Sequence, residues 1–312
     1  MVVSDCERAG LRIVAAAMLL VLALGVASAE MYSVQKDQSL YGTLNQHDVH
    51  HAVPPNKVAD PDISLNACMP TAFVNSLVYL ENRYPGTYDS LLIQQAGKDI
   101  TGDGVYDTYD DWAYSAEVAA GINYMWTDDR IGTYFRDFYY GKQLYIENYA
   151  PNRTEYAGEG DYNFIVWRPD QGRPALPWVA NRIPTWEFLY GELKDCEDVE
   201  IGVTYNAGGG HALTLTSFNW DDSNNDGIID LSENAQIDYM DPWTGTFELS
   251  SIWQTSPGGY IFTDYGGGSR ITLSASESPN GIPPPTPELS SGALLLFGML
   301  PMGLAWWRRR KT

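Results

Sequence analysis

The segment "VEIGVTYNAGGGHALTLTSF", residues 199–218, carries the clearest structural pattern of the chain. In its first half, valine and isoleucine alternate with other residues, and after the glycines leucine alternates with threonine. Alternation with a period of two predicts half-buried strands, and a glycine-rich link between two of them predicts a hairpin. We therefore expect two joined strands, the second of which begins at His211.

The flanking segments add one helix and more strands. "AQIDYMDPWTGTFEL", residues 235–249, predicts two short strands around a turn, and "GGYIFTDY", residues 258–265, predicts another. Far upstream, "CMPTAFVNSLVYLEN", residues 68–82, has apolar residues at helical spacing, and Pro70 suits a first helical turn. An early helix followed by antiparallel strands predicts the α+β class.

Both ends of the chain have the composition of targeting segments. Arg8 and Arg12 precede an apolar run that closes on Ala-Ser-Ala at residue 29. This pattern is typical of an export signal, with a retained membrane anchor as the alternative. The expected organisation is a signal peptide at 1–29, an irregular lead-in at 30–62, one domain at 63–275, a Pro-rich linker at 276–287 and a sorting tail at 288–312.

The tail has a recognisable order of residues. Pro287-Glu288-Leu289 is followed by a small-polar spacer, an apolar run and the cationic stop at residues 308–311. It resembles the PEP-CTERM signal of Gram-negative bacteria, although that pattern has proline where this chain has Leu289. The resemblance implies exosortase as a processing partner, only transient contact with the inner membrane, and a final location at the cell surface or outside the cell. A plain C-terminal membrane helix is the alternative.

The chain is strongly acidic, with a formal net charge of -21 over 312 residues. Removal of residues 1–29 and 288–312 takes away a net charge of +3, so the remainder is more acidic still. Such a surface repels phosphate backbones and favours cations and basic peptides. We expect no nucleic-acid partner.

Few residues can carry thiol chemistry. After loss of the signal peptide only Cys68 and Cys196 remain, and His211 is the one histidine outside the lead-in. Asp241 ends the following predicted strand, where it can face the imidazole. A helix N-terminus and a neighbouring imidazolium both favour a thiolate, and an acid on the far ring nitrogen fixes the tautomer. The alternatives are a disulfide between the two cysteines, a buried inert Cys68, a structural His211 and a turn role for Asp241.

These motifs resemble the papain-like cysteine peptidases, in particular their bacterial double-glycine-peptidase-like branch. The matching residues are Cys68 in "NACMPTA", His211 in "GGHALTLTSF" and Asp241 in "IDYMDPWTG". The resemblance implies a papain-like α+β fold, in which the helix bearing Cys68 packs on an antiparallel sheet bearing His211 and Asp241. It also implies a nucleophile, a general base and an orienting residue that act on a peptide or protein substrate.

One position departs from that family. Its members usually have an oxyanion-hole glutamine about six residues before the cysteine, whereas this chain has Asp62; Asn66 or Gln46 can take its place. We expect an exported cysteine hydrolase, a peptidase with Asn66 beside the triad. The alternatives are an acyl or amide transferase with the same triad, and a non-catalytic calcium-binding protein of the cell surface or extracellular matrix.

Two segments have the spacing of twelve-residue calcium loops, with ligands at positions 1, 3, 5, 7, 9 and 12 and glycine at position 6. "DSNNDGIIDLSE" offers Asp222, Asn224, Asp226, the carbonyl of Ile228, Asp230 and Glu233. "DITGDGVYDTYD" offers Asp99, Thr101, Asp103, the carbonyl of Val105, Asp107 and Asp110. They resemble dockerin-type loops inserted in another fold, and the expected metal is structural calcium. The alternative is an acidic turn.

The lead-in also contains "HDVHH", residues 47–51. His47, His50, His51 and Asp48 suggest zinc, but adjacent histidines do not easily face one ion. A solvated loop is the preferred interpretation.

Overall fold

The computed structural model describes residues 30–57, 59–161 and 176–281. Within these residues, ten strands form one sheet. The strands are β1 (Glu30–Gln35), β2 (Thr154–Gly160), β3 (Val179–Asn181), β4 (Asp198–Tyr205), β5 (Gly210–Leu215), β6 (Ser217–Asp222), β7 (Gln236–Asp241), β8 (Thr246–Gln254), β9 (Ile261–Thr263) and β10 (Ser269–Pro279). The predicted signal peptide and sorting tail lie outside the described residues.

Six of these strands close into a ring. Each neighbouring pair in the order β7-β5-β4-β10-β9-β8 is antiparallel, and β8 pairs with β7 to complete the circle. Outside the ring, β6 joins β7 and carries β1, while β2 joins β10 and carries β3 in parallel. The predicted α+β papain-like fold is therefore wrong, because the described structure is mainly a closed antiparallel sheet with four outer strands and five α-helices.

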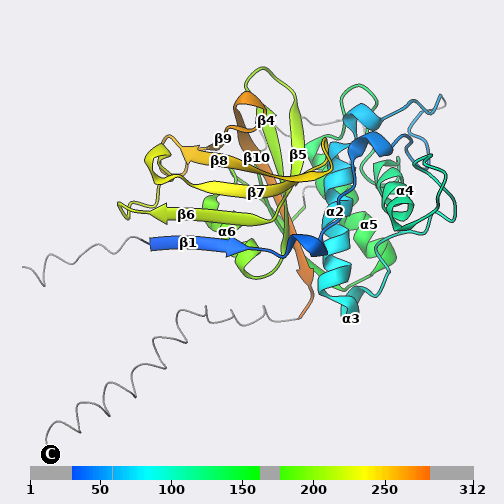
Figure 1. Cartoon of the computed structure of the whole chain (residues 1–312), viewed down its shortest axis with the longest axis horizontal. Coiled ribbons are helices and arrows are strands. Elements are labelled where there is room, and N and C mark those ends of the chain that lie inside the picture. Colours follow the sequence, from blue (N-terminus) through cyan, green and yellow to red (C-terminus); the bar gives the residue numbers. More distant parts are fainter. Residues whose placement is uncertain (1–29, 58, 162–175, 282–312) are drawn as a thin grey trace, which may run out of the picture.

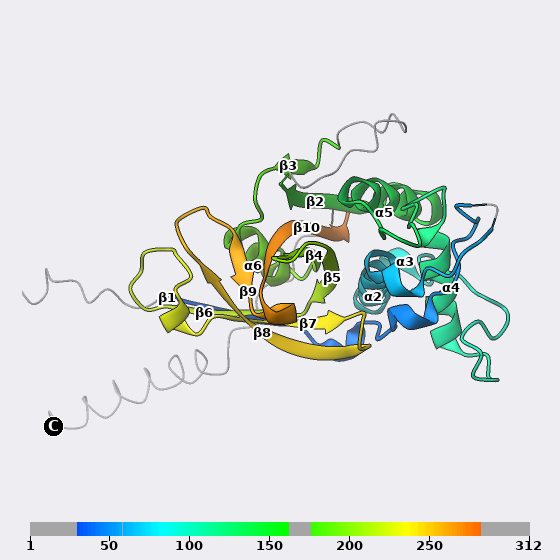
Figure 2. The same ribbon diagram turned by 90° about the horizontal axis from the view of Figure 1, so that it is seen from above.

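The helices are α2 (Cys68–Arg83), α3 (Pro85–Tyr88), α4 (Thr108–Ala120), α5 (Phe135–Tyr149) and α6 (Trp186–Lys194). The first four gather on one side of the ring, and α6 lies apart from them near β1 and β6 (Figures 1 and 2). No helix among the described residues is long and apolar enough to cross a membrane.

Two apolar cores result from this arrangement. One surrounds α2 and includes side chains of α4 and α5 together with Ala212 and Ala275 of the sheet. The other lies among the strands and α6, and it receives Val199, Ile201 and Val203 from alternate positions of β4. The intervening Glu200 is also buried, so β4 is covered on both faces. Successive residues of β4 therefore contact different partners on the two faces of the sheet.

The ends of the domain differ from expectation. The lead-in was predicted to be irregular, yet its first six residues form β1, which pairs along its whole length with β6. An edge strand needs only backbone partners, so its side-chain pattern is weak. At the other end, β10 runs to Pro279, into the predicted linker. The rest of that linker, residues 282–287, lies outside the described residues.

Candidate active site

Cys68 is the first residue of α2, directly after a 3-10 turn at Ser64–Asn66. Pro70 lies in the first helical turn, where the N–H that proline lacks would have no helical partner. Every α2 side chain from Met69 to Leu80 is buried, so the core fixes the position of the helix. The thiol is half-buried at the end of the helix where free N–H groups favour an anion.

The alternative of a disulfide is wrong, because Cys68 and Cys196 are both free thiols. The Cys196 Sγ lies 3.8 Å from a guanidinium nitrogen of Arg83, at the opposite end of α2. At 1.5 Å per residue, the 16 residues of this helix separate its ends by roughly 22 Å. A disulfide requires Cα atoms about 6 Å apart.

His211 is positioned by the β4-β5 hairpin, in which it pairs with Val203. A Cβ on the preceding Gly210 would lie 2.6 Å from the Val203 carbonyl oxygen, so this position requires glycine. Farther along β5, the Thr214 hydroxyl donates to the Ala72 carbonyl of α2 at 2.9 Å. Since Ala72 is one turn beyond Cys68, this bond holds the strand against the part of the helix that carries the thiol.

The three residues predicted as catalytic lie together. His211 Nε2 is 2.8 Å from Asp241 Oδ1, and the two residues are 6% and 3% exposed. Cys68 interacts with the same imidazole. Because Nε2 is engaged by Asp241, Nδ1 is the nitrogen available to the sulfur. The arrangement therefore runs from thiol to imidazole to carboxylate, and its catalytic role stays a prediction.

The charges in this chain of contacts support one another. Burial opposes ionisation of Cys68, but the hydrogen bond and charge of His211 lower the pKa of the thiol below its usual value. Burial likewise disfavours charge on His211, yet its bonds to Asp241 and Cys68 raise the pKa of the imidazole to about 9. The same imidazole holds the pKa of buried Asp241 below its usual value. Each of these contacts therefore favours the charged forms, a thiolate on Cys68 and an imidazolium on His211, over the neutral forms.

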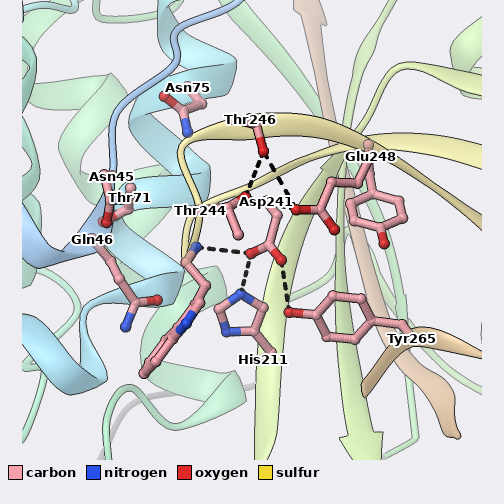
Figure 3. A network of polar contacts seen from close by, with 12 residues as sticks. Asn45, Gln46, Thr71, Asn75, His211, Asp241, Thr244, Thr246, Glu248 and Tyr265 are labelled. Atoms are coloured by element: carbon pink, nitrogen blue, oxygen red, sulfur yellow. Dashed lines mark hydrogen bonds and ion pairs between the residues drawn. The ribbon is translucent and has the colours of Figure 1, made fainter. Parts of the chain in front are cut away.

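Two further residues hold Asp241, and sequence reasoning did not identify them. The Trp243 backbone N–H donates to Oδ1 at 2.8 Å, and the Tyr265 hydroxyl donates to Oδ2 at 2.9 Å. Figure 3 shows the carboxylate between His211 and Tyr265. Tyr265 ends the segment "GGYIFTDY" that was expected to be a strand, and no sequence pattern indicated where its aromatic ring would lie.

A cavity of about 410 Å³ opens beside Cys68 and His211. Apart from these two residues, its lining carries uncharged side chains: Gln46, Leu65, Asn66, Met69, Ile131, Gly132, Thr133, Tyr134, Phe135, Thr204, Tyr205, Gly209, Gly210 and Trp243. Leu65, Ile131 and Trp243 are exposed, although they are apolar. The cavity is therefore suited to an uncharged, partly apolar group.

Both amides considered as oxyanion donors line this cavity. Asn66 donates Nδ2 to the Asp129 carbonyl at 2.7 Å. Gln46 is buried, donates Nε2 to the Ser64 carbonyl at 3.0 Å, and lines the same cavity as His211. An amide nitrogen has two hydrogens, so each residue retains one donor beyond these bonds.

The loop Asp222–Glu233 has the predicted backbone turn, since Gly227 adopts a φ of 71°. Asp222 accepts the N–H groups of Asp226 and Gly227, both at 3.1 Å, which folds the loop around its first carboxylate. The closing Glu233, however, accepts hydrogen bonds from Trp220 and Ser223. The backbone fits a calcium loop, whereas Glu233 would have to leave these partners to bind an ion.

The loop Asp99–Asp110 is similar in form. Asp99 accepts the N–H groups of Gly102 at 2.6 Å and Gly104 at 2.9 Å. Asp110 accepts the N–H of Thr101 and, as part of the capping box of α4, that of Asp107. The last predicted ligand therefore already has a role as a helix cap.

The histidines of the lead-in, which were considered as zinc ligands, do not converge on one point. His50 and His51 face different carboxylates, Asp62 at 3.6 Å and Asp60 at 3.4 Å. His47 instead packs edge-on against Trp243, with 4.5 Å between ring centroids. The three imidazoles thus have separate partners, and the interpretation as a solvated loop stays a prediction.

Among the described residues, one set of three acidic side chains has its oxygens within 4.8 Å of one another: Asp198, Glu200 and Glu277. All three are buried, and sequence reasoning did not identify them. The ammonium of Lys142 forms ion pairs with Glu200 and Glu277, so this cluster already contains a cation of the protein. None of the predicted calcium ligands belongs to it.

No protein-family model matches this chain, and no curated protein matches it. The functional assignment therefore depends on the geometry of Cys68, His211 and Asp241 and on the cavity beside them.

Proposed function

We propose that the protein is a cysteine hydrolase that cleaves amide bonds in peptides. The observation that supports this most directly is the contact chain from Cys68 through His211 to Asp241 at a cavity with an uncharged lining. A merely buried cysteine needs neither an imidazole partner nor a carboxylate on the far side of that imidazole.

In the proposed reaction, the Cys68 thiolate attacks the carbonyl carbon of the scissile amide and forms a tetrahedral intermediate. His211 then transfers its proton to the leaving amine, the carbon–nitrogen bond breaks, and a thioester remains on the sulfur. Water next gives a proton to His211 and attacks the thioester, which releases a carboxylic acid and restores the Cys68 thiolate beside the protonated His211. Asp241 keeps Nε2 protonated and thereby leaves Nδ1 to exchange the proton.

The developing oxyanion needs hydrogen-bond donors. The backbone N–H of Cys68, at the start of α2, supplies one. For the second we favour Gln46, because its buried amide is anchored by Ser64 and lines the cavity beside Cys68 and His211. Asn66, the residue selected from the sequence, is held by Asp129 and is the alternative.

The lining of the cavity supports a class of substrate. The exposed side chains of Leu65, Ile131 and Trp243 form an apolar rim, and no acidic or basic side chain lines the cavity apart from the catalytic pair. Burial of apolar surface would therefore contribute most of the binding energy. We propose that an uncharged peptide segment with an apolar side chain binds here.

We also propose calcium as a structural ion of the loop Asp222–Glu233. This loop connects β6 to β7, the strand that ends at Asp241, and its backbone has the required turn. Bound calcium would add a clamp on that connection, and none of the chemical steps above requires it. A calcium-binding protein without catalysis is the second candidate, favoured by the same loop geometry.

Export and surface sorting remain proposals from the terminal segments. The apolar run within residues 1–29 and the PEP-CTERM-like tail at 288–312 support them, with exosortase as the partner and a Gram-negative cell surface as the destination.

The first experiment uses Cys196 as an internal control. The protein is treated with limiting iodoacetamide at neutral pH, and the label on each cysteine is measured by mass spectrometry. We expect Cys68 to react faster than Cys196, and His211→Ala to abolish the difference. A survey of peptide cleavage products with wild type and Cys68→Ala then tests hydrolysis. Equal labelling of the two cysteines, together with identical peptide products, would refute the hydrolase.

A further inference from the structure

Tyr265 contacts two neighbouring members of the proposed catalytic chain. Its hydroxyl donates to Asp241 Oδ2 at 2.9 Å. Its ring stacks on the His211 ring, with 5.7 Å between centroids and an interplanar angle of 9°. Figure 3 shows the three side chains together. One side chain therefore restrains both the carboxylate and the face of the imidazole.

The turn that carries Tyr265 depends on glycine. Gly266, Gly267 and Gly268 all have positive φ, and a Cβ on Gly266 would lie 2.6 Å from the ring of Tyr205. This close approach lets Tyr205 stack on Tyr265, with 6.2 Å between centroids and an angle of 17°. The Tyr265 ring thus contacts the rings of both His211 and Tyr205.

The hydroxyl of Tyr265 is the donor that holds Oδ2 of Asp241. Asp241 is 3% exposed, and its other oxygen, Oδ1, already receives His211 Nε2 and the Trp243 N–H. Without the tyrosine hydroxyl, Oδ2 would be a buried acceptor that has lost its partner. Such an oxygen is costly, so the carboxylate would rotate in search of another donor and its alignment with His211 would loosen.

We propose that Tyr265 is a positioning residue that sets the tautomer and orientation of His211, acting through Asp241 and by covering one face of the ring. The proposal rests on the hydrolase function above, because it assigns Tyr265 to the pair of Cys68 and His211. When Asp241 is fixed on Nε2, the proton stays on that nitrogen and Nδ1 faces the sulfur.

The test compares Tyr265→Phe, which keeps the ring and loses the hydroxyl, with Tyr239→Phe. Tyr239 is a matched control, because it also packs against Tyr265 but its hydroxyl bonds to Ser250 instead of the triad. Alkylation of Cys68 by iodoacetamide is measured across the pH range of imidazole and thiol titration, and proton NMR monitors the ring N–H of His211.

For Tyr265→Phe we expect alkylation of Cys68 at neutral pH to slow about tenfold, the effect of losing one hydrogen bond to a buried charge. The thiol should titrate at higher pH, and the low-field N–H signal of His211 should broaden or vanish. Tyr239→Phe should match wild type in all three measurements. In an Asp241→Asn background, Tyr265→Phe should have no further effect, because its route of action is already removed.

The outcomes separate the two proposals. If wild-type Cys68 reacts no faster than Cys196, the hydrolase fails and Tyr265 has nothing to position. If wild-type Cys68 reacts fast and Tyr265→Phe matches Tyr239→Phe in rate, titration and NMR signal, the role of Tyr265 is overturned while the hydrolase stands. Should Tyr265→Phe not fold, Gly266→Ala provides the comparison. It keeps the hydroxyl but displaces the turn, and an unchanged rate in that variant would also overturn the role.

Discussion

Replacement of Lys142 by methionine should expose how strongly the buried acidic cluster constrains the fold. Lys142 of α5 is fully buried and forms ion pairs with Glu200 of β4 and Glu277 of β10, which are also fully buried. Asp198 completes the cluster, so one ammonium faces three carboxyl groups. Methionine has a similar length and no charge. The variant therefore removes the cation with little change in volume.

The size and pH dependence of the effect follow from burial. Loss of one partner of a buried ion pair costs roughly 3–5 kcal/mol. At about 2–4 °C per kcal/mol for a domain of this size, the melting temperature should fall by roughly 10 °C.

The pH dependence follows from the raised pKa values of the acidic cluster. Burial, reinforced by the charge of Glu200, raises the pKa of Asp198 to about 7. Burial also raises the pKa of Glu277, while Lys142 opposes both shifts. A carboxyl with a raised folded pKa loses stability as pH rises through that value. The deficit of the variant should therefore be small near pH 5 and large near pH 8, where wild-type Asp198 has ionised.

Urea unfolding and calorimetry of wild type, Lys142→Met and a control at both pH values would measure this. Lys36→Met is the control, because Lys36 is also buried but its ammonium contacts the Tyr79 hydroxyl at 3.4 Å, and burial lowers the pKa of this lysine to about 8. Lys36→Met should lose less stability than Lys142→Met, above all at pH 8. A second comparison adds Glu277→Gln to Lys142→Met, which should restore part of the loss. The reasoning fails if Lys142→Met costs about 1 kcal/mol or less near pH 8, the effect of an average substitution, or if its deficit is the same at both pH values.

Three other expectations concern the site. In Cys68→Ser, NMR titration should place the pKa of His211 above its usual value. Adding Asp241→Asn to this variant should lower the pKa of His211, since the bond to Asp241 raises it. Equal pKa values with and without Asp241→Asn would contradict the assigned contact. Gln46→Ala should reduce peptide cleavage about 100-fold, the usual effect of losing one oxyanion donor, without slowing alkylation of Cys68. If cleavage and alkylation fall by the same factor, the role of Gln46 is structural. Calcium chelation should lower the melting temperature of wild type but not that of Asp222→Ala; an unchanged wild-type melting temperature would end the calcium proposal.

The sequence predicted the local elements around the site well. Helical spacing after Cys68 and alternation around His211 indicated the elements that the structure has as α2, β4 and β5. These patterns are local, because a helix or hairpin buries a face set by its own residues. The pairing of β9 with β10 and of β8 with β7, which closes the sheet, left no comparable signal, so the predicted fold class was wrong.

Some of the functional side chains could likewise be identified from the sequence, and others could not. The scarcity of cysteine and histidine in the mature chain identified Cys68 and His211 as candidates, and the predicted strand order added Asp241. The sequence did not indicate the roles of Tyr265 and Lys142, since tyrosine is abundant and a lysine is expected at the surface. Their roles depend on contacts between different elements of the fold, such as Tyr265 with Asp241 at the end of β7, and Lys142 on α5 with Glu277 on β10.

The sequence by itself determined which segments form a helix or a hairpin and which few residues can perform thiol chemistry, because periodicity and residue type are local properties. Only the tertiary structure decided that the strands close into a ring, that the two cysteines lie at opposite ends of α2, and that Tyr265 holds Asp241. Those outcomes depend on which distant surfaces bury each other, and that choice is made by the packing of the whole chain.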